Sequence, residues 1–355
     1  FESVTIENGT LVYRDLAAGT EERVEGLDAD IAAESLRGPF RATGKARLRG
    51  VAAGFELSTG RLEEGSSAPL TVALKVGQTK LSFAGSATVA GADSAVAGQL
   101  KGGGPSLIAL LDALAPGAGS GLPVALADEF AIDGEVAAGP AAVEVRNLTL
   151  RLANLTASGA VSLSPGEPPR AKVALTMGHI DLDKLLGGAT PTAAPILSET
   201  APAPTGAAGF ALPTNFEAEV DVAVEAIGYR GGVISKARLV AALANGEVTL
   251  TRLSALLPGG SDVTVAGVLG AEAGAPRFAG AVEASSDNLR GLLDWLQAVP
   301  PDMPSDRLRK TSLTARVTAT PASLELADMD LRLDASRVTG GVVVAQPPAG
   351  VRARP

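Results

Sequence analysis

The sequence contains two similar stretches, Val143–Leu163 (VEVRNLTLRLANLTASGAVSL) and Leu324–Val344 (LELADMDLRLDASRVTGGVVV), which align with each other without a gap. A third copy begins at Val248 (VTLTRLSALLPGGSDVTVAGVLG) and is two residues longer at its turn. Apolar and polar residues alternate in all three copies, which is the period-two pattern of a β-strand with one apolar face. The chain therefore contains a repeated unit of paired strands.

The alternation changes phase at the same point of each copy. The slip lies between Val145 and Leu148, between Leu250 and Leu253, and between Leu326 and Met329. A one-residue slip turns the following side chains to the other side of a sheet unless a β-bulge absorbs the extra residue. We therefore predict a bulge or a strand bend in each copy.

The repeated units also end alike. Ser106, Asp181 and Asn288 each precede Leu, two variable residues and Leu-Leu, as in SLIALL, DLDKLL and NLRGLL. Ser, Asp and Asn are preferred helix N-caps, so each motif predicts a short amphipathic helix. A nearly constant spacing separates these caps from a glycine in the preceding strand, namely Gly85, Gly159 and Gly267.

Turn signals complete the prediction of the fold class. Asn8-Gly9 and Asn245-Gly246 lie between apolar runs and predict two hairpins with type I′ turns. Gly102-Gly-Gly-Pro105 superficially suggests a phosphate cradle, but it matches no phosphate-binding motif and predicts a flexible turn. The expected fold is mainly β: an elongated, repetitive, curved antiparallel sheet, shaped like a groove or taco, with a few short amphipathic helices.

A segment rich in Pro, Ala and Thr divides the chain. Residues 187–215 contain five prolines and few large apolar side chains, which is typical of a linker or loop. We expect an N-terminal β-rich repeat region over 1–186 and a C-terminal one over 216–355. Because Phe1 comes first and the last repeat stops before a helix could follow, we also expect that the native protein extends beyond both ends.

Composition excludes several classes of protein. The chain has 355 residues, 30 Lys plus Arg, 39 Asp plus Glu, and a net charge of −9, so nucleic acid is not an expected partner. There is no Cys, which excludes disulfides and cysteine-ligated metals. Every long apolar run is interrupted well before the ~18 residues that a membrane-spanning helix needs.

One cluster has metal-ligand residue types. As a strand, His179-Ile-Asp181-Leu-Asp183 would place all three side chains on one face, where they could bind a metal. We favour the simpler interpretation that Asp181 caps a helix, and we expect neither a metal nor a cofactor. His179 is the only histidine, and no nucleophile motif or aromatic-flanked carboxylate pair accompanies it, so we expect no enzymatic activity.

The chain resembles the AsmA family of bacterial envelope proteins in a set of short motifs. These are Val4–Asp15 (VTIENGTLVYRD), Gly38–Phe40, Ile180–Leu186 (IDLDKLL), Tyr229–Val233 (YRGGV), Leu257–Asp262 (LPGGSD), Ser285–Leu293 (SSDNLRGLL) and Leu331–Arg337 (LRLDASR). The resemblance implies a periplasmic, β-rich protein held to the inner membrane by an N-terminal helix that this sequence lacks. It also implies a hydrophobic groove that carries phospholipid towards the outer membrane, as is thought for TamB-like and YhdP-like relatives.

Together with the alternation, the resemblance implies a set of lipid-contacting residues. The candidates are Val143, Val145, Leu150, Leu152, Val161, Val263, Val265, Leu331, Leu333, Val342 and Val344. Periodicity alone favours a different interpretation, in which these apolar faces pack against a second sheet as an ordinary core. The resemblance reverses that preference.

The segment after Asn288 predicts a helix with one apolar face. Its candidate residues are Leu289, Leu292, Leu293, Trp295 and Leu296. Such a helix packs on the end of a sheet or, alternatively, acts as a gate or plug over a groove. The leading hypothesis is a non-enzymatic lipid-handling protein, and the alternative is an envelope scaffold that binds proteins rather than lipids.

Overall fold

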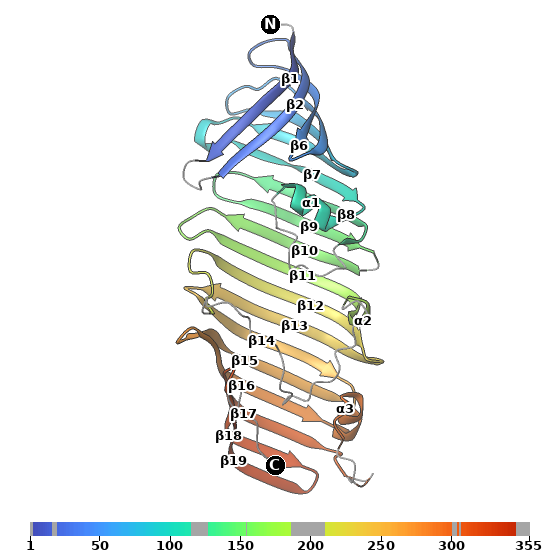
Figure 1. The fold of residues 1–355 in the computed structure, drawn as a ribbon, viewed down its shortest axis with the longest axis vertical. Helices are drawn as coiled ribbons and strands as arrows, with labels where there is room; N and C mark the ends of the chain where they lie inside the picture. The colour runs from blue at the N-terminus through green and yellow to red at the C-terminus, as the bar shows by residue number, and fades with distance from the viewer. Residues whose placement is uncertain are drawn as a thin grey trace, which may run out of the picture. The chain divides into compact units, whose positions relative to one another are not determined.

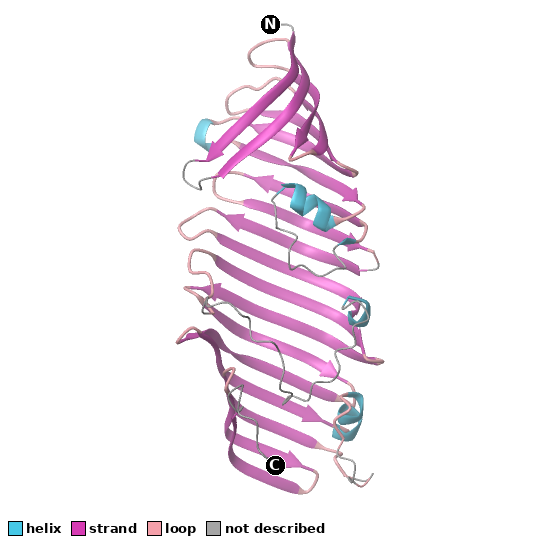
Figure 2. Ribbon diagram, viewed as in Figure 1, coloured by secondary structure: helices cyan, strands magenta, loops and turns pink. Residues whose placement is uncertain are grey.

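The computed structural model describes residues 3–15, 20–114, 127–153, 155–185, 210–299, 304 and 307–345. Within these ranges it contains nineteen β-strands, three short α-helices and one 3-10 helix (Figures 1 and 2). The prediction of a mainly β, repetitive antiparallel fold with a few short helices is confirmed. The chain divides into two units, Phe1–Pro165 and Gly166–Pro355.

The first unit is an antiparallel meander, because each of its strands pairs with the next along the chain. Its elements are β1 (Ser3–Asp15), β2 (Thr20–Ala33), β3 (Phe40–Leu48), β4 (Val51–Thr59), β5 (Ser67–Val76), β6 (Thr79–Thr88), the 3-10 helix Gly91–Asp93, β7 (Ala95–Gly104), α1 (Leu107–Leu114), β8 (Phe130–Ala138), β9 (Val143–Leu152) and β10 (Leu155–Ser164). The sheet twists strongly, so that β1 and β2 run steeply across the direction of β9 and β10 (Figure 1).

The second unit starts with the one parallel pair among the described strands, β11 with β12, and continues as an antiparallel meander. Its elements are β11 (Arg170–Asp181), α2 (Leu182–Leu185), β12 (Glu217–Tyr229), β13 (Gly232–Ala244), β14 (Glu247–Leu257), β15 (Ser261–Glu272), β16 (Ala275–Ser286), α3 (Leu289–Trp295), β17 (Thr311–Ala319), β18 (Ser323–Leu333) and β19 (Ser336–Ala345). The long connection from β11 to β12 lets the chain return to the start of β11, as a parallel pair requires.

The boundary between the units differs from the predicted one. The second unit begins at Gly166 and includes β11 and α2, whereas the sequence pattern predicts that the N-terminal region extends to residue 186. Of the expected linker at 187–215, residues 187–209 lie outside the described ranges.

Each unit has one apolar and one polar face, because directly opposed residues of antiparallel strands point to the same side of the sheet. In the first unit one row runs Gly44, Phe55, Leu74, Leu81, Gly102 across β3–β7. The adjacent row, one residue along, runs Lys45, Gly54, Lys75, Lys80, Gly103. We call these two sides the apolar face and the polar face.

Bulges keep the apolar side chains on one face, as predicted for all three copies. In β9 the pairs with β10 jump from Leu148 to Val145, and matching register shifts occur between Leu250 and Leu253 of β14 and between Leu326 and Met329 of β18. Asn147 and Asp328 take a left-handed backbone there, with φ of 49° each. Asn and Asp tolerate this conformation better than other residues with a Cβ atom.

The two Asn-Gly dipeptides behave differently. Asn245-Gly246 forms the predicted hairpin turn, with Ala244 opposite Glu247 and positive φ at both turn residues. The hairpin predicted at Asn8-Gly9 is wrong, because these residues lie inside β1, where they form another bulge against β2. The flexible turn predicted at Gly102–Gly104 is also wrong, since all three glycines belong to β7.

The three predicted helix caps are confirmed. Each cap side chain accepts a hydrogen bond from a backbone N–H of the first turn: Ser106 Oγ from Ala109, Asp181 Oδ1 from Lys184 and Asn288 Oδ1 from Gly291, all at 3.1 Å. Each helix begins soon after a strand ends, at β7, β11 or β16. The repeat detected in the sequence is therefore a structural repeat.

The bulge at Asn147 gives a first testable prediction. Asn147→Val is expected to lower the free energy of unfolding by about 1–2 kcal/mol, because a β-branched residue is strained in the left-handed region. Asn147→Gly removes that strain and is expected to stay within about 0.5 kcal/mol of the parent. Urea unfolding followed by circular dichroism measures both, with Thr149→Val as the control at an ordinary strand position. Equal stability of N147V and T149V would contradict the role given to the bulge.

Candidate functional site

On the apolar face of the second unit, one row of side chains crosses six strands without a polar residue. The directly opposed residues are Ala255, Val263, Ala284, Leu313, Leu331 and Val338, from β14 to β19. A second row on the same face consists of Leu250, Gly267, Gly280, Val317, Leu326 and Val342. In the first unit, β8–β10 contribute Ile132, Leu150 and Ala157 in one row.

All eleven candidate residues from the sequence lie on the apolar face of their unit. Val143, Val145, Leu150, Leu152 and Val161 lie on β9 and β10, and Val263, Val265, Leu331, Leu333, Val342 and Val344 lie on β15, β18 and β19. Their common face follows from the register, for example Val145 opposite Val161. Whether they contact lipid stays a prediction.

The apolar face is largely uncovered by protein within each unit. Among the described residues no large side chain is fully buried. Leu74 in the middle of the first unit is 42% exposed, and Leu253 in the second is 44% exposed. A face packed against a second sheet would bury such leucines, so this exposure argues against the sandwich core within a unit.

Helix α1 covers one end of the apolar face in the first unit (Figure 1). Leu110 of the helix forms a small buried cluster with Phe130 and Leu152, which is only 5% exposed. Val76, Leu107, Ile132, Leu150 and Leu155 pack around this cluster. Arg49 donates a hydrogen bond from Nη1 to the Ala113 carbonyl near the end of the helix, at 3.3 Å. Leu152 therefore contacts α1, and the open part of the face begins beyond it.

Helix α3 packs on strand ends in the second unit (Figure 1). Trp295 Nε1 donates a hydrogen bond to the Tyr229 carbonyl at 3.0 Å, and the two rings meet edge to face with centroids 6.2 Å apart. A Cβ atom on Gly232 would lie 2.3 Å from Trp295 Nε1, so only glycine fits beneath the indole. Of the five candidate residues, Leu289, Leu292, Leu293 and Trp295 are half-buried and Leu296 is exposed. A role as a gate stays a prediction.

Two glycine pairs on the apolar face were missed by the sequence analysis. Gly85 lies opposite Gly98, and Gly267 lies opposite Gly280. A Cβ atom on Gly98 would come within 2.7 Å of the Phe83 ring, and one on Gly267 within 2.7 Å of the Phe278 ring. The rings thus lie against bare backbone, an arrangement in which an aromatic side chain compensates for glycines in a strand. A phenylalanine two residues from one glycine of each pair is the signal that could have revealed it.

The possible metal cluster is not assembled. Because β11 ends at Asp181, Asp183 lies on α2 rather than on the strand face with His179, which corrects that geometry. The Asp181 carboxylate accepts hydrogen bonds from the ammonium and the backbone N–H of Lys184. These two contacts lower the pKa of the Asp181 carboxyl. Asp183 Oδ2 accepts a hydrogen bond from the Arg230 backbone N–H at 2.9 Å. Within the described ranges, no three His, Asp or Glu side chains are grouped so as to hold a metal.

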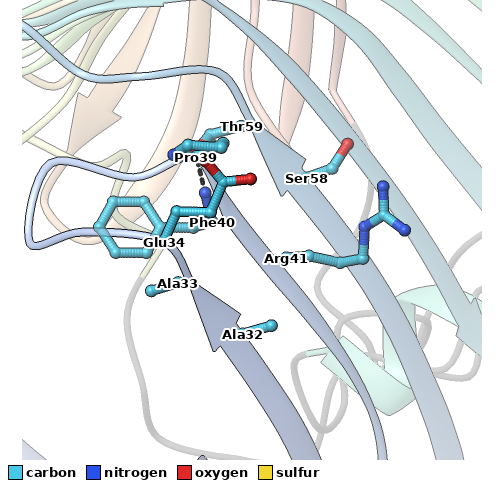
Figure 3. A pocket seen from close by; sticks show the side chains of 8 residues that line it. All are labelled: Ala32, Ala33, Glu34, Pro39, Phe40, Arg41, Ser58 and Thr59. Carbon is cyan, nitrogen blue, oxygen red and sulfur yellow. Dashed lines mark hydrogen bonds between the residues drawn. The ribbon is translucent and has the colours of Figure 1, made fainter. Parts of the chain in front are cut away.

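A hollow of about 470 Å³ lies where β2 ends, β3 begins and β4 ends (Figure 3). The Phe40 backbone N–H donates to Thr59 Oγ1 there at 3.2 Å. Figure 3 shows the Arg41 guanidinium on the side of Ser58, away from Glu34. The charged groups do not converge on one point, so the arrangement suggests no specific chemistry.

The covered and open parts of the apolar face lead to a second prediction. Leu110→Ala is expected to lower the free energy of unfolding by about 2–4 kcal/mol, because it leaves a cavity in the α1 cluster. Leu74→Ala is expected to cost less than about 1 kcal/mol, because the side chain is already half in water. Urea unfolding of both variants measures the difference. Similar losses for the two would mean that the middle of the face is a packed core.

None of the helices in the described ranges is long and apolar enough to cross a membrane. Comparison with protein families, with curated proteins and with solved structures finds no match to this chain.

Proposed function

We propose that the chain is a non-enzymatic lipid-handling protein that binds phospholipid acyl chains on its apolar face. The observation that carries this proposal is the continuous apolar row from Ala255 to Val338 with leucines such as Leu253 left exposed. Large exposed apolar surfaces in soluble domains are typical of binding sites.

The dimensions and the energetics fit an acyl chain. Six strands spaced about 4.8 Å apart give an apolar row of roughly 24 Å, longer than the ~15 Å that one leaflet of a bilayer core measures. Each buried CH₂ group contributes about 0.8 kcal/mol, so even a partly bound acyl chain gains several kcal/mol. The charged polar face keeps the other side of the sheet in water.

The residues that carry the family resemblance support the same proposal. Tyr229–Val233 forms the turn beneath Trp295, Leu257–Asp262 forms the next turn along this edge, and Ser285–Leu293 ends β16 and begins α3. These motifs therefore fix α3 on the strand ends beside the apolar face. By the resemblance, we place the chain in the periplasm of a Gram-negative bacterium, attached to the inner membrane and serving phospholipid transport in outer-membrane biogenesis.

A protein-binding scaffold of the envelope is the second candidate. Strand β19 favours it, because among the described strands it pairs only with β18, and Val338 and Val343 on it are more than half exposed. Strands with an unpaired edge bind other proteins by strand addition. Both candidate functions require an exposed apolar surface, but only the lipid-handling function requires an acyl chain to bind on the apolar face.

Two neighbouring valines of β19 separate these candidates. Val342 lies on the apolar face opposite Leu326 and is 43% exposed, whereas Val343 lies on the polar face opposite Glu325 and is 65% exposed. Val342→Asp is expected to reduce binding of a fluorescent fatty acid or phospholipid at least tenfold, since it puts a charge on the acyl-chain surface. Val343→Asp is the matched control and is expected to change binding less than twofold.

The titration is done with the full chain, and thermal unfolding of each variant is recorded beside it. Equal effects of V342D and V343D, or no lipid binding by the parent protein, would contradict the lipid-handling proposal. Capture of a protein partner that V343D and V342D weaken alike would favour the scaffold.

A further inference from the structure

The polar face of β3–β7 has a charge opposite to that of the chain. These five strands contain six basic residues, Arg41, Lys45, Arg47, Lys75, Lys80 and Lys101, and one acidic residue, Glu56. The chain as a whole has a net charge of −9. By register, all seven side chains lie on the polar face, on the other side of the sheet from the proposed acyl-chain surface.

Two lysines in this patch are directly opposed. Lys75 on β5 pairs with Lys80 on β6, and like charges in directly opposed positions destabilise a sheet. Neither ammonium has an ion-pair or hydrogen-bond partner among the residues that the structure describes, whereas Lys45 lies 3.5 Å from Asp28 and Lys101 lies 3.6 Å from Asp133. The fold therefore keeps an uncompensated pair of positive charges at this point.

The lysines surround a hollow of about 780 Å³ in the sheet. Its lining includes Gly54 and Gly103, the lysines Lys75, Lys80 and Lys101, and one carboxylate residue, Glu56. A Cβ atom on Gly54 would meet nothing closer than a carbonyl oxygen 3.7 Å away, so space is open above this glycine. Two adjacent rows of polar-face residues contribute to the lining, one with Lys75 and Lys80 and the other with Ser82 and Lys101, which places the hollow on the polar face. The strands between these rows contribute Gly44, Phe55, Leu81 and Gly102 to the lining.

We propose that this hollow binds a phosphate group, held between the ammonium groups of Lys75 and Lys80 with Lys101 beside them. Each ammonium offers three N–H donors, and hydrogen bonds from a cation to an anionic oxygen are among the strong ones in proteins. A bound phosphate also removes the repulsion between the opposed lysines. Hydroxyl groups of Thr43 and Ser82 line the same hollow and add neutral hydrogen-bonding partners.

A phospholipid headgroup and a soluble phosphate ester share this chemistry, so the test uses one probe for each source. Inorganic pyrophosphate is titrated calorimetrically into the full chain, and vesicles of phosphatidylglycerol or phosphatidylcholine are sedimented with it. The parent is expected to bind pyrophosphate or phosphatidylglycerol vesicles more tightly than phosphatidylcholine vesicles. Salt is expected to weaken the binding, because the lysines are exposed.

The test variant is Lys75→Gln combined with Lys80→Gln. Each lysine is expected to contribute about a factor of five to the affinity for pyrophosphate or phosphatidylglycerol vesicles, so the double variant is expected to lose about 25-fold. The control, Lys172→Gln combined with Lys184→Gln, removes the same charge from two lysines that are paired with Glu219 and Asp181, and it is expected to lose less than about twofold. K75Q/K80Q is expected to unfold at the same temperature as the parent or a higher one, since it relieves repulsion.

The outcomes separate the sources and the proposals. Binding of pyrophosphate alone supports a soluble phosphate ester as the ligand, and vesicle binding displaced by pyrophosphate supports a lipid headgroup. Absence of binding to either probe, or equal losses in K75Q/K80Q and K172Q/K184Q, would overturn the phosphate site. Neither result bears on acyl-chain binding, because Val342 lies on the apolar face and in the other unit.

Discussion

Strand register determines which side chains share a face of the sheet. In each unit the register places nearly every large apolar side chain on one face and nearly every charge on the other. The bulges at Asn147 and Asp328 maintain that separation where the sequence pattern changes phase. Without the bulges, the valines and leucines beyond each slip would lie on the polar face and the charged residues there would lie on the apolar face.

One consequence is an apolar surface that the described protein leaves open. Cross-strand pairs stabilise each sheet, and the one buried hydrophobic cluster found in the described residues is that of Leu110, Phe130 and Leu152. The glycine pairs beside Phe83 and Phe278 occur at equivalent places of the two units. In each pair the aromatic ring packs against backbone that carries no side chain. An apolar ligand that bound an uncovered face of this kind would stabilise the folded state, which is the link between the fold and the proposed function.

The sequence predicted the features that depend on local patterns. The alternation of apolar and polar residues predicts the strands and the bulges. The cap residues Ser106, Asp181 and Asn288 predict the three helices. Asn8-Gly9 and Asn245-Gly246 have the same turn chemistry, yet only the second is a turn, because pairing with β2 continues through the first. Gly102–Gly104 likewise form a strand because their neighbours on β6 and β8 supply pairing partners.

Features that depend on several strands could not be predicted. Lys45, Lys75 and Lys80 meet in one row only because β3, β4, β5 and β6 pair in a particular register. The sequence placed Leu152 among the residues of an open groove, and the packing of α1 on it appears only in three dimensions. The same holds for Gly232, whose missing side chain makes room for Trp295.

Site-specific photo-cross-linking identifies what the apolar face contacts in the cell. Benzoylphenylalanine replaces Leu253, which is exposed on the apolar face opposite Val265, or Val268, which is exposed on the polar face opposite Thr249. After irradiation in a Gram-negative host, the adducts are identified by mass spectrometry. If the apolar face binds acyl chains, a phospholipid adduct forms at position 253 and none forms at position 268. Protein adducts alone at position 253, or equal lipid labelling at both positions, would contradict acyl-chain binding on this face.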